Sequence, residues 1–238
     1  MERLLVLFAR APESEARDKG LPRAPSAALF AALAREWRTA AHVVGAQLAV
    51  SAPLEDFPGW RRAMPRSADV LWLDQRGRTF GARLQDAALR ASRLARNVVL
   101  TGGDVVPSRS ALSAAFRALD SGAEAAIAPA PDGGISLLAV PVDADLLREV
   151  GRRRRDVFRR LYRRLLSRGR AIAIVHPVPD VDGRSSLRRT AVVPRLRELV
   201  ASVRRSCRIA PLTDRRERPF LTAPSKDPVA PRGPPLAA

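Results

Sequence analysis

The chain alternates short runs of apolar residues with longer segments in which apolar and polar residues recur at helical spacing. Several of the short runs have no polar alternation, which is typical of strands that helices cover on both faces. This pattern predicts a single-domain α/β fold with a mostly parallel, wound sheet and helices on both faces. The predicted strands are residues 4–9, 46–51, 69–73, 97–101, 123–128, 135–140 and 171–175.

Amphipathic segments between and after these strands predict helices. Ser108 follows Pro107 and precedes apolar residues at helical spacing, so it is a candidate N-cap. Pro194 has no amide hydrogen and is expected to kink or split the last helix. The predicted helices are residues 25–42, 79–96, 108–120, 156–167 and 185–203.

The 238 residues divide into a patterned body and a tail. Residues 1–205 carry the strand and helix signals without an internal repeat, and we expect them to form one domain. From Ser206 onward the periodicity stops and proline is frequent, so residues 206–238 are predicted to be a largely disordered tail.

Cysteine usage and hydropathy indicate the cellular compartment in which the protein works. The single cysteine, Cys207, excludes a disulfide framework and a multi-cysteine zinc site, and it fits a reducing compartment. No run approaches the roughly 18 apolar residues of a membrane span, and the start shows no signal-peptide cleavage pattern. We therefore expect a cytoplasmic protein without a transmembrane segment.

The formal charge of +18 has two interpretations. Clustered cations bind polyanions by releasing counterions, which would indicate a nucleic-acid partner. However, only Lys19 and Lys226 are lysines among the 42 basic residues, and Ala, Pro and Gly are abundant, so much of the charge fits GC-rich codon usage on a solvated surface. No interleaved aromatic residues or binding module accompany the charge, which favours the second interpretation.

Arginine is densest in the segment 152–170, which begins at Arg152 and ends at Arg170. Val157, Phe158, Leu161, Leu165 and Leu166 recur at spacings of three and four and predict one buried stripe, with arginines facing water. The alternative is a patch for nucleic acid or an anionic membrane surface. The four consecutive arginines 152–155 are its best candidates, because they point around a whole helical turn.

Three loops fall where a wound sheet presents its ligands, outside the carboxyl ends of its strands. The first, from Arg10 to Arg23, carries Lys19 among basic residues, glycine and proline. It suits a loop that grips phosphates, or equally a charged surface loop, since its acidic residues dilute the positive field.

The second loop is Gly102-Gly103-Asp104, directly after a predicted strand. The two glycines allow a sharp turn and close approach of a ligand. Asp104 can then hold a divalent cation that bridges a nucleotide's phosphates, because hard ions prefer oxygen ligands. Alternatively, Asp104 only caps the following turn or helix.

The third loop holds Asp180-Val181-Asp182 after the last predicted strand. We expect only one of these aspartates to face a shared cation unless the backbone turns. Asp182 can equally cap the next helix. In Asp132-Gly133-Gly134, which joins two predicted strands, the residues are also typical of a tight turn. Neither histidine belongs to a catalytic or ligand constellation.

The order and spacing of five segments carry a family resemblance across residues 3–200. The segments are LVLFARAP from Leu5, QRGRTFGARL from Gln75, VVLTGGDVVP from Val98, APAPDGGISLL from Ala128 and PDVDGRSSL from Pro179. Together they resemble an uncharacterised bacterial family of GT-A-type, glycosyltransferase-like proteins. That family is related in fold to nucleotidyltransferases, so the resemblance implies a nucleotide-diphospho-sugar transferase fold.

The resemblance also implies roles for particular residues. Asp104 would be the metal-binding aspartate after the central strand, with Asp182 and Asp180 as further metal ligands. Asp132 would be catalytic, with Gly133 and Gly134 lining the acceptor or sugar side. The nucleotide would be bound by Ala9, Arg10, Lys19, Gly81, Arg83, Gly102 and Gly103.

What the resemblance implies about activity is a metal-dependent transferase that uses Mg²⁺ or Mn²⁺ and a nucleotide-linked donor, with glycosyl transfer to an unidentified acceptor. Two alternatives stay open. Substrate-side positions depart from the family pattern, for example Ile135 and Ser136 in place of an aromatic pair, so the chain could be a degenerate relative that acts as a basic binding protein. The second alternative is nucleotidyl transfer.

Overall fold

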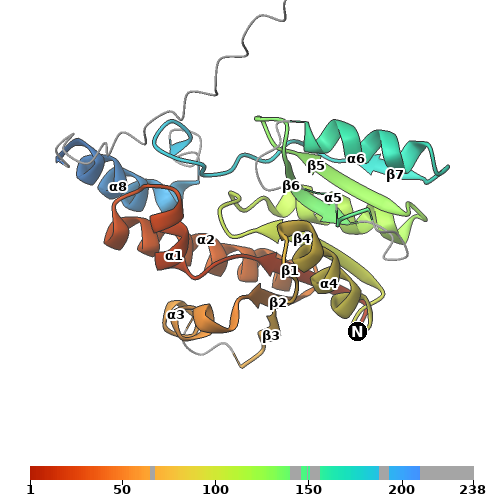
Figure 1. Ribbon diagram of the computed structural model, residues 1–238, viewed down its shortest axis with the longest axis horizontal. Coiled ribbons are helices and arrows are strands. Elements are labelled where there is room, and N and C mark those ends of the chain that lie inside the picture. Colours follow the sequence, from red (N-terminus) through yellow and green to blue (C-terminus); the bar gives the residue numbers. More distant parts are fainter. Residues whose placement is uncertain (65–67, 140–145, 149, 151–155, 188–192, 210–238) are drawn as a thin grey trace, which may run out of the picture.

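A computed structural model describes residues 1–64, 68–139, 146–148, 150, 156–187 and 193–209 of the chain. Its seven-stranded sheet has the order β3-β2-β1-β4-β6-β5-β7 (Figure 1). β6 runs antiparallel to β4 and β5, and the other neighbours are parallel, as the apolar pattern predicts. The strands are β1 (Arg3–Phe8), β2 (Gln47–Ala52), β3 (Leu71–Asp74), β4 (Asn97–Gly102), β5 (Ala125–Pro129), β6 (Ile135–Ala139) and β7 (Ile172–Ile174).

Helices cover both faces of this sheet, because the residues that point to either face of its central strands are apolar. On one face, Leu5 and Leu7 of β1 share a core with Trp37 and Phe116. On the other, Leu4 packs with residues of the two remaining sheet helices. The first face carries α2 (Arg23–Val43) and α5 (Arg109–Asp120); the second carries α4 (Phe80–Ser92) and α6 (Val157–Leu166).

Local capping explains where two of these helices begin. The Ser108 side chain accepts a hydrogen bond from the Ala111 amide, as the sequence predicts for the N-cap of α5. Thr79 accepts in the same way from the Ala82 amide, so α4 begins one residue later than predicted. Both helices start beside carboxyl ends of strands, which is where a wound sheet places its site.

Two predictions for helices are wrong. The first loop is not irregular, because α1 (Pro12–Asp18) forms within it with proline in the first turn, where a missing amide hydrogen costs nothing. A 3₁₀ turn, η1 (Leu54–Asp56), and α3 (Phe57–Ala63) also follow β2 without having been predicted.

At the other end of the chain, the helix predicted over residues 185–203 is not continuous among the described residues, which agrees with a split at Pro194. Pro194 begins the 3₁₀ turn η2 (Pro194–Leu196). α8 (Arg197–Ile209) follows it and continues through the boundary expected at residue 205. Its buried residues Val200 and Val203 pack with Phe30 of α2 and Ala16 of α1 (Figure 1). Residues 210–238 of the expected tail lie outside the described residues.

The arginine-rich helix α6 follows its predicted pattern with one exception. Leu161 and Leu165 are buried, whereas Arg159 and Arg163 are exposed, so the stripe faces the sheet. Leu166, predicted to be buried, is half exposed. Arg152, Arg155 and the two arginines between them lie outside the described residues. Within the described part of the chain, no helix is long and apolar enough to cross a membrane.

Candidate functional site

A cavity of about 420 Å³ lies at the carboxyl ends of β1 and β4. Most residues that the sequence singles out line it. Residues predicted for the nucleotide, the metal and the acceptor are among them: Ala9, Arg10, Lys19, Arg83, Gly102, Gly103, Asp104, Asp132, Gly134, Asp180 and Asp182. The cavity therefore brings together loops that are far apart in the sequence.

The double glycine after β4 lets the cavity wall close tightly. A Cβ on Gly103 would lie 2.5 Å from the Cβ of Ala9, and one on Gly102 would lie 2.5 Å from Asp104 Oδ1. Real Cβ atoms do not approach so closely, so only glycine fits here without a shift. The two glycines therefore allow β1 to approach and the Asp104 carboxylate to fold back over the strand end.

Backbone hydrogen bonds join the Asp104 loop to the segment with the other two aspartates. Val105 and Asp180 form an isolated antiparallel bridge. The Val106 amide donates to the Pro179 carbonyl at 2.8 Å, and the Val181 amide donates to the Asp104 carbonyl at 2.9 Å. Asp104 and the 180–182 segment are thus held side by side.

Asp180 and Asp182 both face the cluster, because residues two apart in an extended segment project to the same side. A turn follows Asp182. The Ser186 hydroxyl oxygen accepts from the amides of Asp182 and Gly183 at 2.9 and 3.2 Å and donates to the Gly183 carbonyl. The expectation that only one of the two aspartates faces the site is therefore wrong, whereas Val181 between them is buried in the core. Residues 183–186, which follow Asp182, form a turn and not a helix. Asp182 therefore caps no helix in this segment.

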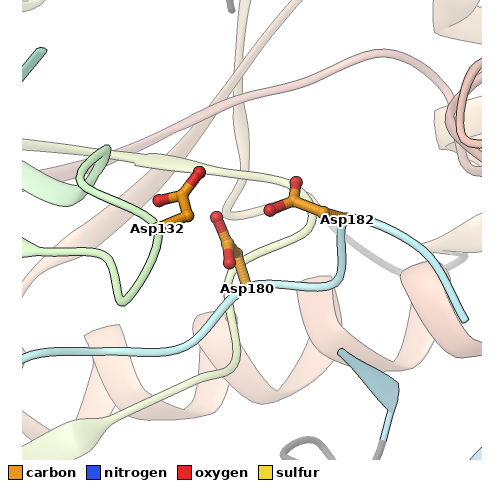
Figure 2. A group of neighbouring side chains, drawn as sticks. All are labelled: Asp132, Asp180 and Asp182. Atoms are coloured by element: carbon orange, nitrogen blue, oxygen red, sulfur yellow. The ribbon is translucent and has the colours of Figure 1, made fainter. Parts of the chain in front are cut away.

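Asp132 completes an acidic triad, which we define as Asp132, Asp180 and Asp182. A carboxylate oxygen from each lies within 4.8 Å of the others, and Figure 2 shows the three groups converging. The Gly134 amide donates to Asp132 Oδ1 at 2.8 Å, and Gly133 has a φ of 91°. The predicted tight turn is therefore present, and it also aims Asp132 at the other two carboxylates.

Burial, together with the crowding of these carboxylates, raises the pKa of Asp180 to about 7. Burial is the largest cause, followed by the negative charges of Asp182, Asp104 and Asp132. Lys19 opposes the shift without cancelling it. The triad thus holds more negative charge than the surrounding protein cations balance.

Lys19 lies between Asp104 and Asp182. Its Nζ is 2.6 Å from Asp104 Oδ2, 3.1 Å from Asp182 Oδ1 and 3.7 Å from Glu15 Oε1, and its side chain is 9% exposed. Burial alone would lower the Lys19 pKa, but the Asp104 charge and hydrogen bond, with Glu15 and Asp182, raise it. The ammonium is therefore charged and is surrounded by carboxylates.

The two arginines predicted to bind the nucleotide differ in their surroundings. Arg10 Nε lies 2.6 Å from Asp56 Oδ2, and Arg10 Nη1 lies 3.7 Å from Asp18. The Arg83 side chain makes no ion pair or hydrogen bond within the described residues, and its Nε is buried without a partner. Arg83 is thus the cation at this cavity whose charge no described carboxylate neutralises.

Two predicted site residues do not line the cavity. A Cβ on Gly81 would lie 2.3 Å from the Arg148 carbonyl oxygen and 2.4 Å from that of Leu147, so this glycine lets α4 pack against that turn. Gly133 donates its amide to the Ala130 carbonyl in the turn before β6. Both glycines thus shape the backbone around the cavity without lining it.

Sequence reasoning missed several residues that line this cavity, among them Glu15, Phe80 and Gln75. Glu15, on α1, faces Lys19, although in the sequence it only dilutes a basic loop. Phe80 lies one turn from Arg83 on α4 and packs edge-on against Phe8, with ring centroids 5.5 Å apart. Gln75 donates to the Ser51 carbonyl at 2.9 Å. The signal that could have found Glu15 is its spacing of four residues from Lys19 on a helix.

Comparison with protein families identifies the chain. Residues 33–159, more than half of its length, match a family described as an uncharacterized protein conserved in bacteria (DUF2064). The chain belongs to the DUF2064 family. The matched region includes Gly102, Gly103, Asp104 and Asp132, and no curated protein matches the sequence.

Solved structures share the fold of this DUF2064 protein. A Desulfovibrio desulfuricans G20 protein, a suggested nucleotide-diphospho-sugar transferase, aligns with a TM-score of 0.67 at 20% identity over 85% of this chain and 99% of its own. Rv0371C of Mycobacterium tuberculosis H37Rv, solved with manganese, aligns with a TM-score of 0.50 at 19% identity over 81% and 100%.

A nucleotidyl transferase from Methanothermobacter thermautotrophicus aligns similarly, with a TM-score of 0.50 at 16% identity over 84% of this chain and 98% of its own. At these identities the likeness concerns the fold. The α/β class and the GT-A-type architecture implied by the sequence are thereby confirmed.

Proposed function

We propose that this DUF2064 protein is a metal-dependent transferase that uses a nucleotide-linked donor, with glycosyl transfer from a nucleotide sugar as its reaction. One observation carries the proposal: the acidic triad and Asp104 converge at the carboxyl end of β4, in a cavity that also holds Arg83, a cation without a partner in the described part of the chain. A divalent ion and an anionic donor are the ligands that this pairing of charges suits.

The acidic triad fits a divalent cation in two respects. Its donors are carboxylate oxygens, which Mg²⁺ and Mn²⁺ prefer. The Asp180 pKa is raised first by burial and then by the neighbouring carboxylates, and a dipositive ion would offset the repulsion between those carboxylates. Asp180 and Asp182 would hold the ion, with Asp104 beside them, and Asp132 lies close enough to face it. When bound, such an ion supplies positive charge against the diphosphate leaving group.

The other wall of the cavity suits the donor itself. Phe80, Arg83 and Leu84 are spaced at three and four residues on α4 and share one face. Phe80 and Leu84 offer apolar surface to a base or sugar ring, and the Arg83 guanidinium can bind a phosphate with two hydrogen bonds. Donor phosphates would thus lie between Arg83 and the acidic triad.

Asp132 is the residue that we assign to the acceptor. It is exposed, so an acceptor hydroxyl can reach it, and its Oδ1 is oriented by the Gly134 amide. In glycosyl transfer the hydroxyl oxygen forms a bond to the sugar carbon, the bond from that carbon to the diphosphate oxygen breaks, and the hydroxyl proton passes to Asp132. The diphosphate leaves with the bonding electrons.

The proposal is tested by thermal unfolding with nucleoside diphosphates and nucleotide sugars, each with and without Mn²⁺. A donor at one hundred times its dissociation constant should stabilise the protein by about 2.7 kcal/mol, which raises the melting temperature by about 5–10 °C. Asp182→Asn should abolish the increase, whereas Asp69→Asn, at an exposed ion pair, should retain it. No increase with any pairing of nucleotide and metal would reject the proposal.

Nucleotidyl transfer is the second candidate, since the solved structure from Methanothermobacter thermautotrophicus with the same fold is a nucleotidyl transferase. The two reactions release different products. A glycosyltransferase releases a nucleoside diphosphate from a nucleotide sugar, whereas a nucleotidyltransferase releases pyrophosphate from a nucleoside triphosphate. Measuring both products with Mn²⁺ separates the candidates.

A further inference from the structure

Lys19 makes the same kind of contacts that a bound cation would make. Its ammonium touches carboxylates from three separate segments: Glu15 on α1, Asp104 after β4, and Asp182. The Lys19 side chain is 9% exposed and Asp104 is 23% exposed, so solvent screens their contact less than the contact with the half-exposed Asp182. A lysine in this position is a monovalent cation seated within the acidic site.

Asp182 is the carboxylate that the two arrangements share. It belongs to the acidic triad, and its Oδ1 also contacts Lys19 Nζ at 3.1 Å. A divalent ion held by the triad would be coordinated by this same carboxylate and would lie close to the ammonium. Like charges at such a separation repel strongly, more so where the site is shielded from water.

We propose that Lys19 is a built-in competitor of the divalent ion, so that metal binding releases its ammonium from Asp182 and Asp104. The inference rests on the metal site of the proposed function and adds a coupling to it. Lysine suits this role because its four-carbon stem can move the charge without a backbone change. The released ammonium then faces the cavity, where a donor phosphate is its natural partner.

The competing explanation is a purely structural ion pair that ties α1 to the end of β4. That explanation predicts that removing the charge lowers stability and leaves metal affinity unchanged. Competition predicts tighter metal binding instead, because the ion no longer has to displace the ammonium. The metal affinity of a Lys19 variant therefore separates the two.

The first experiment measures Mn²⁺ binding by calorimetry and by the electron paramagnetic resonance signal of the free ion. Lys19→Met should bind Mn²⁺ at least tenfold more tightly than the wild type. Arg17→Met is the matched control, because it removes the same charge from the exposed face of α1 and should change the affinity less than twofold. Equal or weaker binding by Lys19→Met overturns the inference.

The second experiment follows the wild-type lysine directly. The sequence contains only Lys19 and Lys226, so an amine-acylating reagent followed by mass spectrometry reports on Lys19 individually. The amino group of Met1, an exposed residue, serves as the internal reference. Saturating Mn²⁺ should raise the relative acylation rate of Lys19 severalfold. An unchanged ratio with Mn²⁺ bound overturns the inference.

The two experiments also separate this inference from the proposed function. If wild type and Lys19→Met bind Mn²⁺ with the same affinity and Lys19 stays protected, the metal-dependent function stands and the competition is rejected. If no variant binds Mn²⁺ at all, the metal site of the proposed function is rejected and the competition with it.

Discussion

Arg10 and Asp56 form an ion pair across the rim of the cavity, with Arg10 Nε 2.6 Å from Asp56 Oδ2. Asp56 is 5% exposed, and its other oxygen accepts from Ser14 at 2.9 Å. The pair joins the end of β1 and the start of α1 to the 3₁₀ turn after β2. Arg10 was predicted to bind the nucleotide, and this contact fixes it beside the cavity with its charge largely compensated.

The first prediction concerns the stability that this pair provides. Asp56→Ala should lower the free energy of unfolding by about 2 kcal/mol, because Arg10 and Ser14 lose a charged partner in a half-buried place. Urea unfolding measures the change. Asp69→Ala removes the exposed pair with Arg38 and should cost less than about 1 kcal/mol. Equal effects of the two variants would contradict the structural role of Asp56.

The second prediction concerns the pH dependence of the same pair. Burial raises the Asp56 pKa, but hydrogen bonds from Arg10, Ala11 and Ser14 outweigh it and hold the pKa below its ordinary value. A carboxyl with a lowered pKa in the folded state stabilises the protein above its unfolded pKa of about 3.9 and loses that contribution as the pH falls through its folded pKa.

The stability gap between wild type and Asp56→Ala should therefore be constant near neutral pH and should shrink below about pH 4. Urea unfolding at several acidic pH values measures the gap. A gap that widens with acidity would mean that Asp56 is protonated in the folded protein.

The third prediction tests the close approach of β1 to the double glycine. Gly103→Ala should destabilise the protein by about 1–3 kcal/mol, because the new methyl group would overlap the Cβ of Ala9. Gly183→Ala is the control, since nothing lies within 4 Å of its Cβ position and its φ is ordinary. Thermal unfolding of both variants gives the comparison, and a neutral Gly103→Ala would show that β1 can move away.

The fourth prediction concerns the turn that directs Asp182 toward the acidic triad. Ser186→Ala leaves the amides of Asp182 and Gly183 without their acceptor in a place where Ser186 is 1% exposed. We expect a loss of stability of about 1–3 kcal/mol and weaker Mn²⁺ binding. Ser186→Thr keeps the hydroxyl and should restore the affinity. Failure of threonine to do so would assign the effect to packing.

Much of the scaffold could be predicted from the sequence because local residues determine it. Every predicted strand is present with its described ends within two residues of the prediction, since covered strands are continuous apolar runs. Ser108 was predicted as an N-cap because its hydroxyl group can accept a hydrogen bond from an amide of the first helical turn. By contrast, α1 has no apolar periodicity, and its formation depends on the packing of Ala16 against α2 and α8.

The geometry of the site could not be predicted from local patterns. Asp104 and Asp180 are brought together by a bridge between Val105 and Asp180, which join segments far apart in the chain. Reasoning from the residues offered Asp104 as a cation ligand and only one of Asp180 and Asp182 as another, whereas the family resemblance implied that all three bind the metal. Lys19 was assigned to the nucleotide as a basic loop residue, because nothing in its neighbourhood of the sequence indicates that Asp104 and Asp182 surround it.

The last prediction separates the donor end of the cavity from its metal end. Arg83→Gln should weaken the binding of a nucleoside diphosphate in the presence of Mn²⁺ by about 10- to 100-fold, the loss expected for a charged hydrogen bond. Stability should change by less than about 0.5 kcal/mol, because Arg83 has no partner to lose among the described residues. Calorimetry and urea unfolding measure the two effects.

Two controls locate that effect at the phosphate. Affinity for Mn²⁺ without nucleotide should be unchanged in Arg83→Gln, since Arg83 is absent from the acidic triad. Arg83→Lys keeps the charge but loses the planar fork, so it should recover only part of the nucleotide affinity. If Arg83→Gln binds the nucleoside diphosphate as the wild type does, the phosphates lie elsewhere, and Lys19, once released from Asp104 and Asp182, becomes the cation to test in its place.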